Sequence, residues 1–291
     1  MKLLVTGSNG QLGHEIQKLA KQAPYADHIF YFTDVKELDI CDEEALHQFF
    51  MTHEVDVIIN CAAYTAVDKA ETEPELCERI NRIAPQNLAQ VAQANGARVI
   101  QISTDYVFDG TNHRPYTEDD PTSPCSVYGR TKLAGEEAVL NFCPLSTIIR
   151  TAWLYSIHGT NFVKTMIRLG KTHQALNVVV DQIGTPTYAG DLALAAMKMA
   201  VGTVQPGIYH YTDEGVCSWY DFTLAIHEMA HITDCVVTPI PGSQYPTPAA
   251  RPHYSVLDKQ KIRSVNGITT PYWRDSLRKC IAELNEQETN K

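Results

Sequence analysis

The sequence predicts an α/β fold: a doubly wound parallel sheet with a smaller C-terminal lobe. Short apolar runs alternate with amphipathic segments over the first 150 residues. These runs are apolar at nearly every position, which is typical of strands covered by helices on both faces. The first run also ends in a glycine-rich turn that leads directly into a helical pattern. Together these observations indicate a Rossmann-like sheet.

The elements of the first half follow from the period of their apolar residues. We expect strands at 3–6, 29–33, 55–60, 98–102 and 147–150, where the apolar runs fall. Helical spacing of apolar residues predicts helices at 11–23, 43–51 and 74–93, the last stopped by Gly96. This alternation assigns residues 1–150 to one sheet domain.

The second half is less regular. Residues 178–180 are strand-like, residues 191–201 form an amphipathic helical pattern, and residues 239–252 carry five prolines. We therefore expect a smaller ligand-binding lobe, built mainly from 151–183 and 216–291. The chain is expected to return to the main sheet around 184–215.

Composition excludes several classes of function. A net charge of −10 lacks the basic field that nucleic-acid binding usually requires. The eight cysteines form no CxxC pair, which suggests a reducing compartment and no zinc site. No run approaches the roughly 20 apolar residues of a membrane helix, and the apolar start MKLLVTG is too short for a signal peptide. We expect a soluble, cytoplasmic protein.

The glycine-rich turn, TGSNGQLG at 6–13, has the spacing of a dinucleotide-binding turn. Gly7 would permit the tight turn, Gly10 the approach of a pyrophosphate, and Gly13 the close packing of helix and strand. The helix N-terminus would direct free amides towards the phosphates. An ordinary strand-to-helix turn is the alternative.

Two further segments fit the same ligand. Asp34 ends the second strand about twenty residues after the last glycine, where an acid can accept hydrogen bonds from a ribose diol. It would repel a 2′-phosphate and so favours NADH, although nearby Lys36 weakens that preference; a helix-capping role is the alternative. Asp39 and Ile40 are placed to flank an adenine. The small residues within CAAYT at 61–65 would let the dinucleotide lie across the strand ends, or would simply pack the core.

The reactive candidates are Thr104, Tyr128 and Lys132. Tyr128 and Lys132 are four residues apart, so they share one face of a helix. A neighbouring ammonium is expected to lower the pKa of the phenol and make it a better acid. Thr104 ends a strand of the same sheet, where its hydroxyl can orient a bound carbonyl. With a nicotinamide dinucleotide, these groups form a carbonyl-reduction site. YxxxK alone is often only a surface pair.

The same motifs resemble a known family. TGxxGxxG, the strand-end STD and YxxxK look like the extended short-chain dehydrogenases/reductases. The longer stretches AAYTAVDKAE (62–71), STDYVFDG (103–110), YGRTKLAGE (128–136), DQIGTPT (181–187) and TPAARPHYS (247–255) look like the dTDP-4-dehydrorhamnose reductases. The resemblance runs along essentially the whole chain. It implies reduction of the 4-keto group of dTDP-4-dehydro-L-rhamnose with NADPH or NADH, a choice that the sequence leaves open.

The resemblance also implies site residues. The dinucleotide contacts would be Gly10, Gln11, Leu12, Asp39, Ile40, Ala62, Ala63 and Thr65. The sugar contacts would be Thr104, Asp105 and Trp153, with Val67 and Arg251 as further substrate neighbours. Tyr128 would donate the proton, and Lys132 would also hold the nicotinamide ribose.

Two other functions stay open: a nucleotide-sugar epimerase of the same superfamily, and a non-catalytic regulatory subunit on this fold. The related dehydratases carry a Glu after the Thr-Asp pair, whereas this chain carries Tyr106, which favours simple reduction. Some relatives form Mg²⁺-linked dimers, but position 190, one of their acidic sites, is glycine here. We therefore expect no metal, and a monomer or weak homodimer.

Overall fold

The computed structural model describes residues 1–265 and 267–289 and contains the predicted parallel sheet. Six strands lie in the order β10-β5-β4-β3-β1-β2, and every neighbouring pair is parallel. They are β1 (Lys2–Thr6), β2 (Ile29–Thr33), β3 (Val57–Asn60), β4 (Arg98–Thr104), β5 (Thr147–Thr151) and β10 (Gly207–His210). The chain winds from β1 to β2 in one direction and from β3 to β5 in the other. The strand order therefore reverses between β1 and β3, the place where doubly wound sheets bind ligands.

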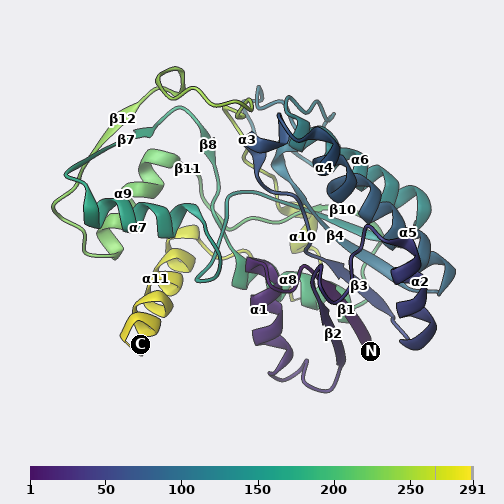
Figure 1. Cartoon of the computed structure of the whole chain (residues 1–291). Coiled ribbons are helices and arrows are strands. Elements are labelled where there is room, and N and C mark those ends of the chain that lie inside the picture. Colours follow the sequence, from purple (N-terminus) through teal and green to yellow (C-terminus); the bar gives the residue numbers. More distant parts are fainter. Residues whose placement is uncertain (266, 290–291) are drawn as a thin grey trace.

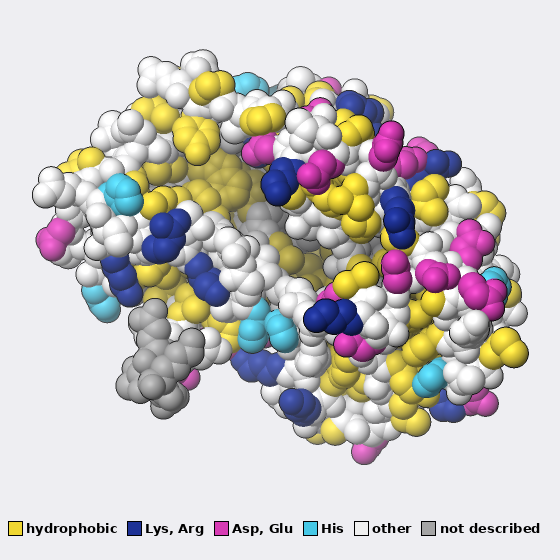
Figure 2. Space-filling view, in the orientation of Figure 1, with side chains coloured by type: hydrophobic (Ala, Val, Ile, Leu, Met, Phe, Trp, Pro, Cys, Tyr) yellow, Lys and Arg dark blue, Asp and Glu magenta, His cyan; other side chains and the backbone are white. Residues whose placement is uncertain are grey.

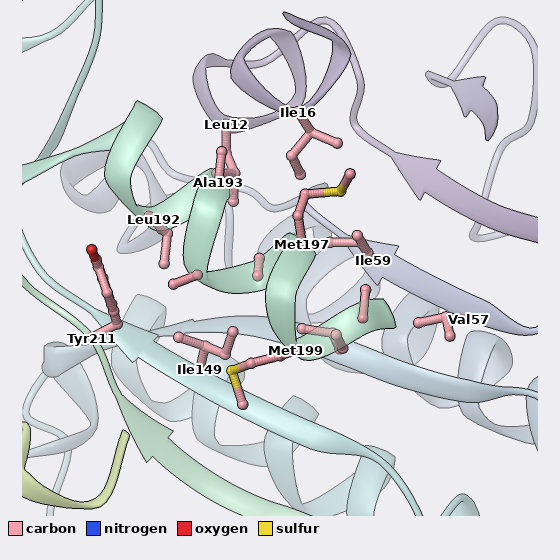
Figure 3. Close-up of a cluster of buried hydrophobic side chains, with 14 of the residues drawn as sticks. Leu12, Ile16, Val57, Ile59, Ile149, Leu192, Ala193, Met197, Met199 and Tyr211 are labelled. Atoms are coloured by element: carbon pink, nitrogen blue, oxygen red, sulfur yellow. The ribbon is translucent and has the colours of Figure 1, made fainter. Parts of the chain in front are cut away.

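Helices cover both faces of this sheet (Figure 1). One face packs against α1 (Gln11–Ala20) and α8 (Ala189–Val201), and the other against α2 (Glu43–Thr52), α5 (Ala84–Ala94) and α6 (Val127–Phe142). Successive residues of β1 show why both faces are apolar: Leu3 and Val5 join the first core, and Leu4 joins the second. In Figure 3, side chains of α8 such as Met197 lie between α1 and the strands.

The segment predicted as one helix at 74–93 contains a local widening. It consists of α4 (Pro74–Glu78), a π-helical turn at Arg79–Ile83, and α5. Within the turn, the Asn81 amide accepts from Tyr64 N (2.9 Å) and donates to Tyr64 O (3.1 Å). These bonds fix the segment that follows β3. Such bulges often occur at functional sites, and no spacing of apolar residues reveals them.

The smaller lobe is built on α7 (Phe162–Thr172), α9 (Trp219–Met229) and α11 (Trp273–Thr289). A parallel pair, β7 (Ala175–Val179) and β12 (Val236–Ile240), lies beside them. The strand predicted at 178–180 is thus longer and begins earlier. The loop predicted at 239–252 begins inside β12, where Pro239 pairs with Val178. A proline is tolerated there because each strand of a two-stranded sheet has a free edge.

The chain crosses between the two parts several times. The short pairs β6 (Leu154–Tyr155) with β9 (Thr187–Tyr188), and β8 (Ile183–Gly184) with β11 (Cys217–Ser218), lie along this path. After β9 the chain returns to the main sheet through α8 and β10. None of the described helices combines the length and apolarity that a bilayer crossing requires.

Candidate active site

Two adjoining cavities lie at the carboxyl ends of the parallel strands, in the hollow between the two parts of the molecule (Figure 2). The first cavity, about 450 Å³, follows β1, β2 and β3; the second, about 520 Å³, follows β3, β4 and β5. Gly10 and Ala63 line both, so the two are continuous. Their combined size suits a dinucleotide with a second ligand.

The predicted site residues divide between these cavities. The first cavity is lined by Gly7, Gly10, Asp34, Asp39, Ile40, Ala62 and Ala63. The second is lined by Gly10, Gln11, Leu12, Gly13, Ala63, Thr65, Val67, Thr104, Asp105, Tyr128, Lys132 and Trp153. Arg251 lines neither cavity. It lies in the loop that follows β12.

The turn between β1 and α1 has the space that a dinucleotide needs. Gly7 has a φ of +61°, and a Cβ there would lie 2.6 Å from Ala62 N. A Cβ on Gly13 would lie 2.5 Å from the Ser8 backbone, so only glycine lets α1 begin this close to β1. Gly10 caps α1 and adds no side chain to the floor of the cavities. The turn therefore fits a pyrophosphate against the free amides of α1.

Charged groups line the first cavity near the end of β2. Asp34 accepts hydrogen bonds from Asn9 N (3.1 Å) and Val35 N (2.8 Å), which hold its carboxylate at the end of β2. Arg79 lines the same cavity and lies 3.6 Å from Asp39. Arg79 was not predicted from the sequence, because a lone arginine within a helical stretch gives no signal. A carboxylate and a guanidinium thus both line the first cavity.

Tyr128 lies in the first turn of α6, where its ring enters the second cavity. Ser126 caps this helix by accepting a hydrogen bond from Gly129 N (3.1 Å). The Tyr128 side chain is 9% exposed, and its ring meets the Tyr106 ring edge-on at 5.4 Å. Burial raises the pKa of the phenol well above its usual range, while a hydrogen bond with Thr104 acts in the opposite direction. The phenol is therefore protonated at neutral pH and can serve as a donor.

Lys132 lies one helical turn further on and is almost fully buried. Its Nζ donates to the Ile102 carbonyl of β4 at 2.6 Å, and burial lowers the pKa of the ammonium to about 8. The expectation that Lys132 lowers the pKa of Tyr128 is not met in the structure. The ammonium bonds to the strand, and the dominant influence on the phenol is burial.

Thr104 and Asp105 end β4 at the floor of the second cavity. Thr104 Oγ1 donates to Asp105 Oδ1 (3.0 Å) and accepts from Tyr106 N (3.2 Å). Burial raises the pKa of Asp105 to about 6, and the hydroxyls of Thr104 and Ser255 oppose that rise. Asp105 Oδ2 has no hydrogen-bond partner among the described residues, although it is buried. An acceptor left unpaired at a cavity floor suits a ligand hydroxyl.

Trp153 forms a wall of the second cavity in an uncommon backbone conformation. Its φ is +49°, which is rare for a bulky side chain. The indole stacks on Trp219, with centroids 3.5 Å apart and planes 11° from parallel. A Cβ on Gly184 would lie 2.6 Å from Trp153 Cε2. Trp219 and Gly184 therefore fix the plane of Trp153, and Gly184 lies within the DQIGTPT stretch of the sequence.

The loop that carries Arg251 is fastened to the edge of the second cavity. Arg251 Nη2 and Asp68 Oδ2 form an ion pair at 2.7 Å, and Ala249 N donates to Asp68 Oδ1 at 3.2 Å. Asp68 belongs to the short helix α3 (Val67–Ala70), whose first residue lines the cavity. Arg251 thus lies at the cavity's edge, bonded to the protein.

The smaller lobe also contacts the start of α1, beside the glycine turn. Asn161 Nδ2 donates to Gln11 Oε1 (2.9 Å), and Asn161 caps α7 by accepting from Lys164 N (3.1 Å). Asn161 lines the second cavity and was missed from the sequence, although an Asn before an amphipathic segment is a recognisable cap. In the described part of the chain, no cluster of three His, Cys, Asp or Glu side chains is arranged to hold a metal ion.

The doubly wound sheet, the glycine turn and the Tyr-Lys pair define an oxidoreductase that uses NAD(P)H. The family model described as "RmlD substrate binding domain" matches residues 1–286, and the chain belongs to this family. It is 43% identical to the dTDP-4-dehydrorhamnose reductase of Mycolicibacterium smegmatis, an alignment that covers 97% of this chain and 86% of that protein.

Solved structures agree with this assignment. A dTDP-4-dehydrorhamnose reductase from Clostridium acetobutylicum is 48% identical, with a TM-score of 0.93 over 98% of this chain and 100% of that chain. The dTDP-4-dehydrorhamnose reductase of Bacillus anthracis, solved in complex with NADP, is 38% identical, with a TM-score of 0.92 over 97% of this chain and 99% of that chain. The chain is thus similar to reductases over nearly its full length.

Proposed function

We propose that this protein reduces the 4-keto group of dTDP-4-dehydro-L-rhamnose to give dTDP-L-rhamnose. The observation that carries the proposal is the placement of Tyr128 beside Thr104 and Lys132, in a cavity continuous with the glycine turn. Relatives named as dTDP-4-dehydrorhamnose reductases support the choice of substrate.

The reaction adds one hydride to the carbonyl carbon and one proton to its oxygen. The dinucleotide, when bound, supplies the hydride. Tyr128 Oη donates the proton to the oxygen, so the phenol becomes a phenolate that must take a proton back from solvent. We expect the buried Lys132 ammonium, one helical turn away, to stabilise the negative charge that develops on Tyr128. The Thr104 hydroxyl, which donates to Asp105 Oδ1 in the structure, would turn to donate to the bound carbonyl and orient it.

Other residues would hold the sugar nucleotide. Asp105 Oδ2 is free to accept a hydrogen bond from a sugar hydroxyl, and the Trp153 ring offers a flat apolar surface to the sugar. Arg251, at the edge of the cavity, suits the diphosphate because its guanidinium can bind two phosphate oxygens at once. Val67 precedes Asp68, the ion-pair partner of Arg251, in α3. It lines the second cavity, where it would contact the substrate.

We also propose that the protein works in a reducing compartment such as the cytoplasm, as a monomer or weak homodimer. All eight cysteines are free, and five of them are buried.

The test is an absorbance assay at 340 nm with the purified protein, NADPH or NADH, and dTDP-4-dehydro-L-rhamnose. We expect stoichiometric loss of absorbance and formation of dTDP-L-rhamnose. Rearrangement of the sugar without net loss of absorbance would instead indicate an epimerase. Dinucleotide binding without any conversion would indicate a regulatory subunit.

A further inference from the structure

The helix that carries Tyr128 and Lys132 presents a third polar side chain on the same face. Glu136 lies one turn beyond Lys132, so positions 128, 132 and 136 follow one another along α6. Each meets a different anchor in the sheet: Tyr128 meets Thr104, Lys132 bonds to Ile102 O, and Glu136 bonds to Arg150. All three side chains are buried.

The Glu136–Arg150 contact has bidentate geometry. Arg150 Nε lies 3.0 Å from Glu136 Oε1, and Arg150 Nη2 lies 2.7 Å from Glu136 Oε2. Both side chains are 2% exposed. Arg150 lies on β5 directly opposite Ser103, one residue before Thr104 in the neighbouring strand. The pair therefore joins α6 to the strands that carry the reactive groups, in a geometry that allows little rotation of the helix.

Among the described residues, Glu136 is the carboxylate that pairs with Arg150, and the other neighbours of Arg150 are aromatic or neutral. The Arg150 guanidinium lies 5.2 Å from the centre of the Phe108 ring, and the Phe108 ring meets His210 edge-on. Burial, followed by the charge of Arg150, lowers the pKa of His210 to about 3, so that imidazole is neutral. A buried ion pair is a costly way to hold a helix, because apolar side chains can replace it at little loss of stability. Its presence here points to a role besides stability.

The charge of Glu136 also acts on Lys132. The titratable groups around the ammonium are Tyr128 and Glu136 on α6, Cys77 on α4, and Cys61 after β3. Burial lowers the pKa of Lys132 to about 8, and the largest opposing influence is the charge of Glu136. Without that carboxylate, Lys132 would lose its proton at a lower pH.

We propose that Glu136, fixed by Arg150, is a positioning residue that keeps Lys132 charged and directed into the second cavity. This inference rests on the proposed function, since Lys132 is taken to hold the nicotinamide ribose and to support Tyr128.

The test measures the dissociation constant of NADPH by its fluorescence from pH 6 to pH 10, together with thermal unfolding. The wild type is compared with Glu136→Gln and with the double variant Glu136→Met/Arg150→Met, which removes both charges and restores an apolar contact. Glu137→Gln is the matched control, because Glu137 is exposed on the same helix.

In the wild type, NADPH affinity should fall above about pH 8, as Lys132 loses its proton. In Glu136→Gln, the fall in NADPH affinity should begin at least about half a pH unit lower. This shift corresponds to roughly threefold weaker binding of the proton by Lys132. The double variant should unfold at nearly the wild-type temperature and keep the displaced pH dependence. Glu137→Gln should match the wild type.

A wild-type pH dependence in Glu136→Gln, or its return in the double variant, would show that the pair serves stability alone and would overturn the inference. Because the readout is binding, failure of the wild type to reduce dTDP-4-dehydro-L-rhamnose would refute the proposed function separately.

Discussion

The two cavities of the active site are built in different ways. The first cavity is bounded largely by backbone: Gly7 and Gly10 leave space, and Asp34 is held by backbone amides at a partly exposed edge. The second cavity is lined by buried polar side chains such as Tyr128 and Asp105, whose pKa values burial shifts upward. We therefore propose that dinucleotide binding rests on the shape of the backbone, and that the chemistry rests on desolvated side chains. Substitutions in the second cavity should consequently have the larger effects.

The largest effect is expected from Tyr128→Phe. Removing the phenolic hydroxyl removes the proton donor, so turnover should fall by about 10²- to 10⁴-fold. NADPH affinity should stay within about twofold, because the ring and the glycine turn are kept. Steady-state kinetics and NADPH fluorescence measure the two quantities. Turnover within tenfold of the wild type would remove Tyr128 from the mechanism.

The next largest effect is expected from Asp105→Asn, because the buried Asp105 carboxylate destabilises the folded protein when it is charged. Its folded pKa is raised from 3.8 to about 6, so the buried carboxyl favours folding below pH 3.8, and this contribution is lost as the pH rises through 6. Asp105→Asn cannot ionise and should be more stable than the wild type at pH 7.5, by about 3 kcal/mol at most.

This advantage should disappear near pH 4, and sugar turnover should fall at either pH. Chemical unfolding at the two pH values is the measurement. An equal difference in stability at both would show that Asp105 titrates normally.

A smaller effect is expected from Trp219→Leu. Trp219 lies behind Trp153 and does not itself line the second cavity. Losing the stack, worth about 0.5–1.5 kcal/mol, should raise KM for the sugar nucleotide about two- to tenfold. The KM for NADPH should stay the same. A rise in both constants would indicate general disruption of the smaller lobe.

The smallest effect belongs to the first cavity. Asp34→Ala removes a negative charge that would repel a 2′-phosphate, while Arg79 stays nearby to attract it. The ratio of kcat/KM for NADPH to that for NADH should rise about fivefold, equivalent to roughly 1 kcal/mol. Because both coenzymes are measured on the same preparation, loss of folded protein cancels. An unchanged ratio would mean that Asp34 does not face the ribose.

The difference between the cavities also explains what the sequence could predict. The parallel sheet and the glycine turn follow from short-range spacing, and the relatives confirm the fold and the use of NAD(P)H. Arg79 and Asn161 escaped prediction because their places depend on a π-helical turn and on contact between distant segments. The pKa of Tyr128 escaped it as well, because burial cannot be read from the four-residue spacing to Lys132.

The resemblance supplied what spacing could not. Gly184 and Ser255 lie within the stretches DQIGTPT and TPAARPHYS, and they meet Trp153 and Asp105 in the structure. Their function is to support other side chains, so no motif of catalytic residues names them. Their contacts could not be predicted from the sequence, because they form only when the smaller lobe packs against the end of β4.

The most direct test of carbonyl reduction follows deuterium from NADPH to the sugar. Reaction of dTDP-4-dehydro-L-rhamnose with NADPH that carries deuterium at both C4 positions, analysed by mass spectrometry and NMR, shows where the hydride goes. The account predicts one deuterium at C4 of dTDP-L-rhamnose and none elsewhere on the sugar. Product without deuterium, or with deuterium at another carbon, would contradict the assignment of the second cavity as a carbonyl-reduction site.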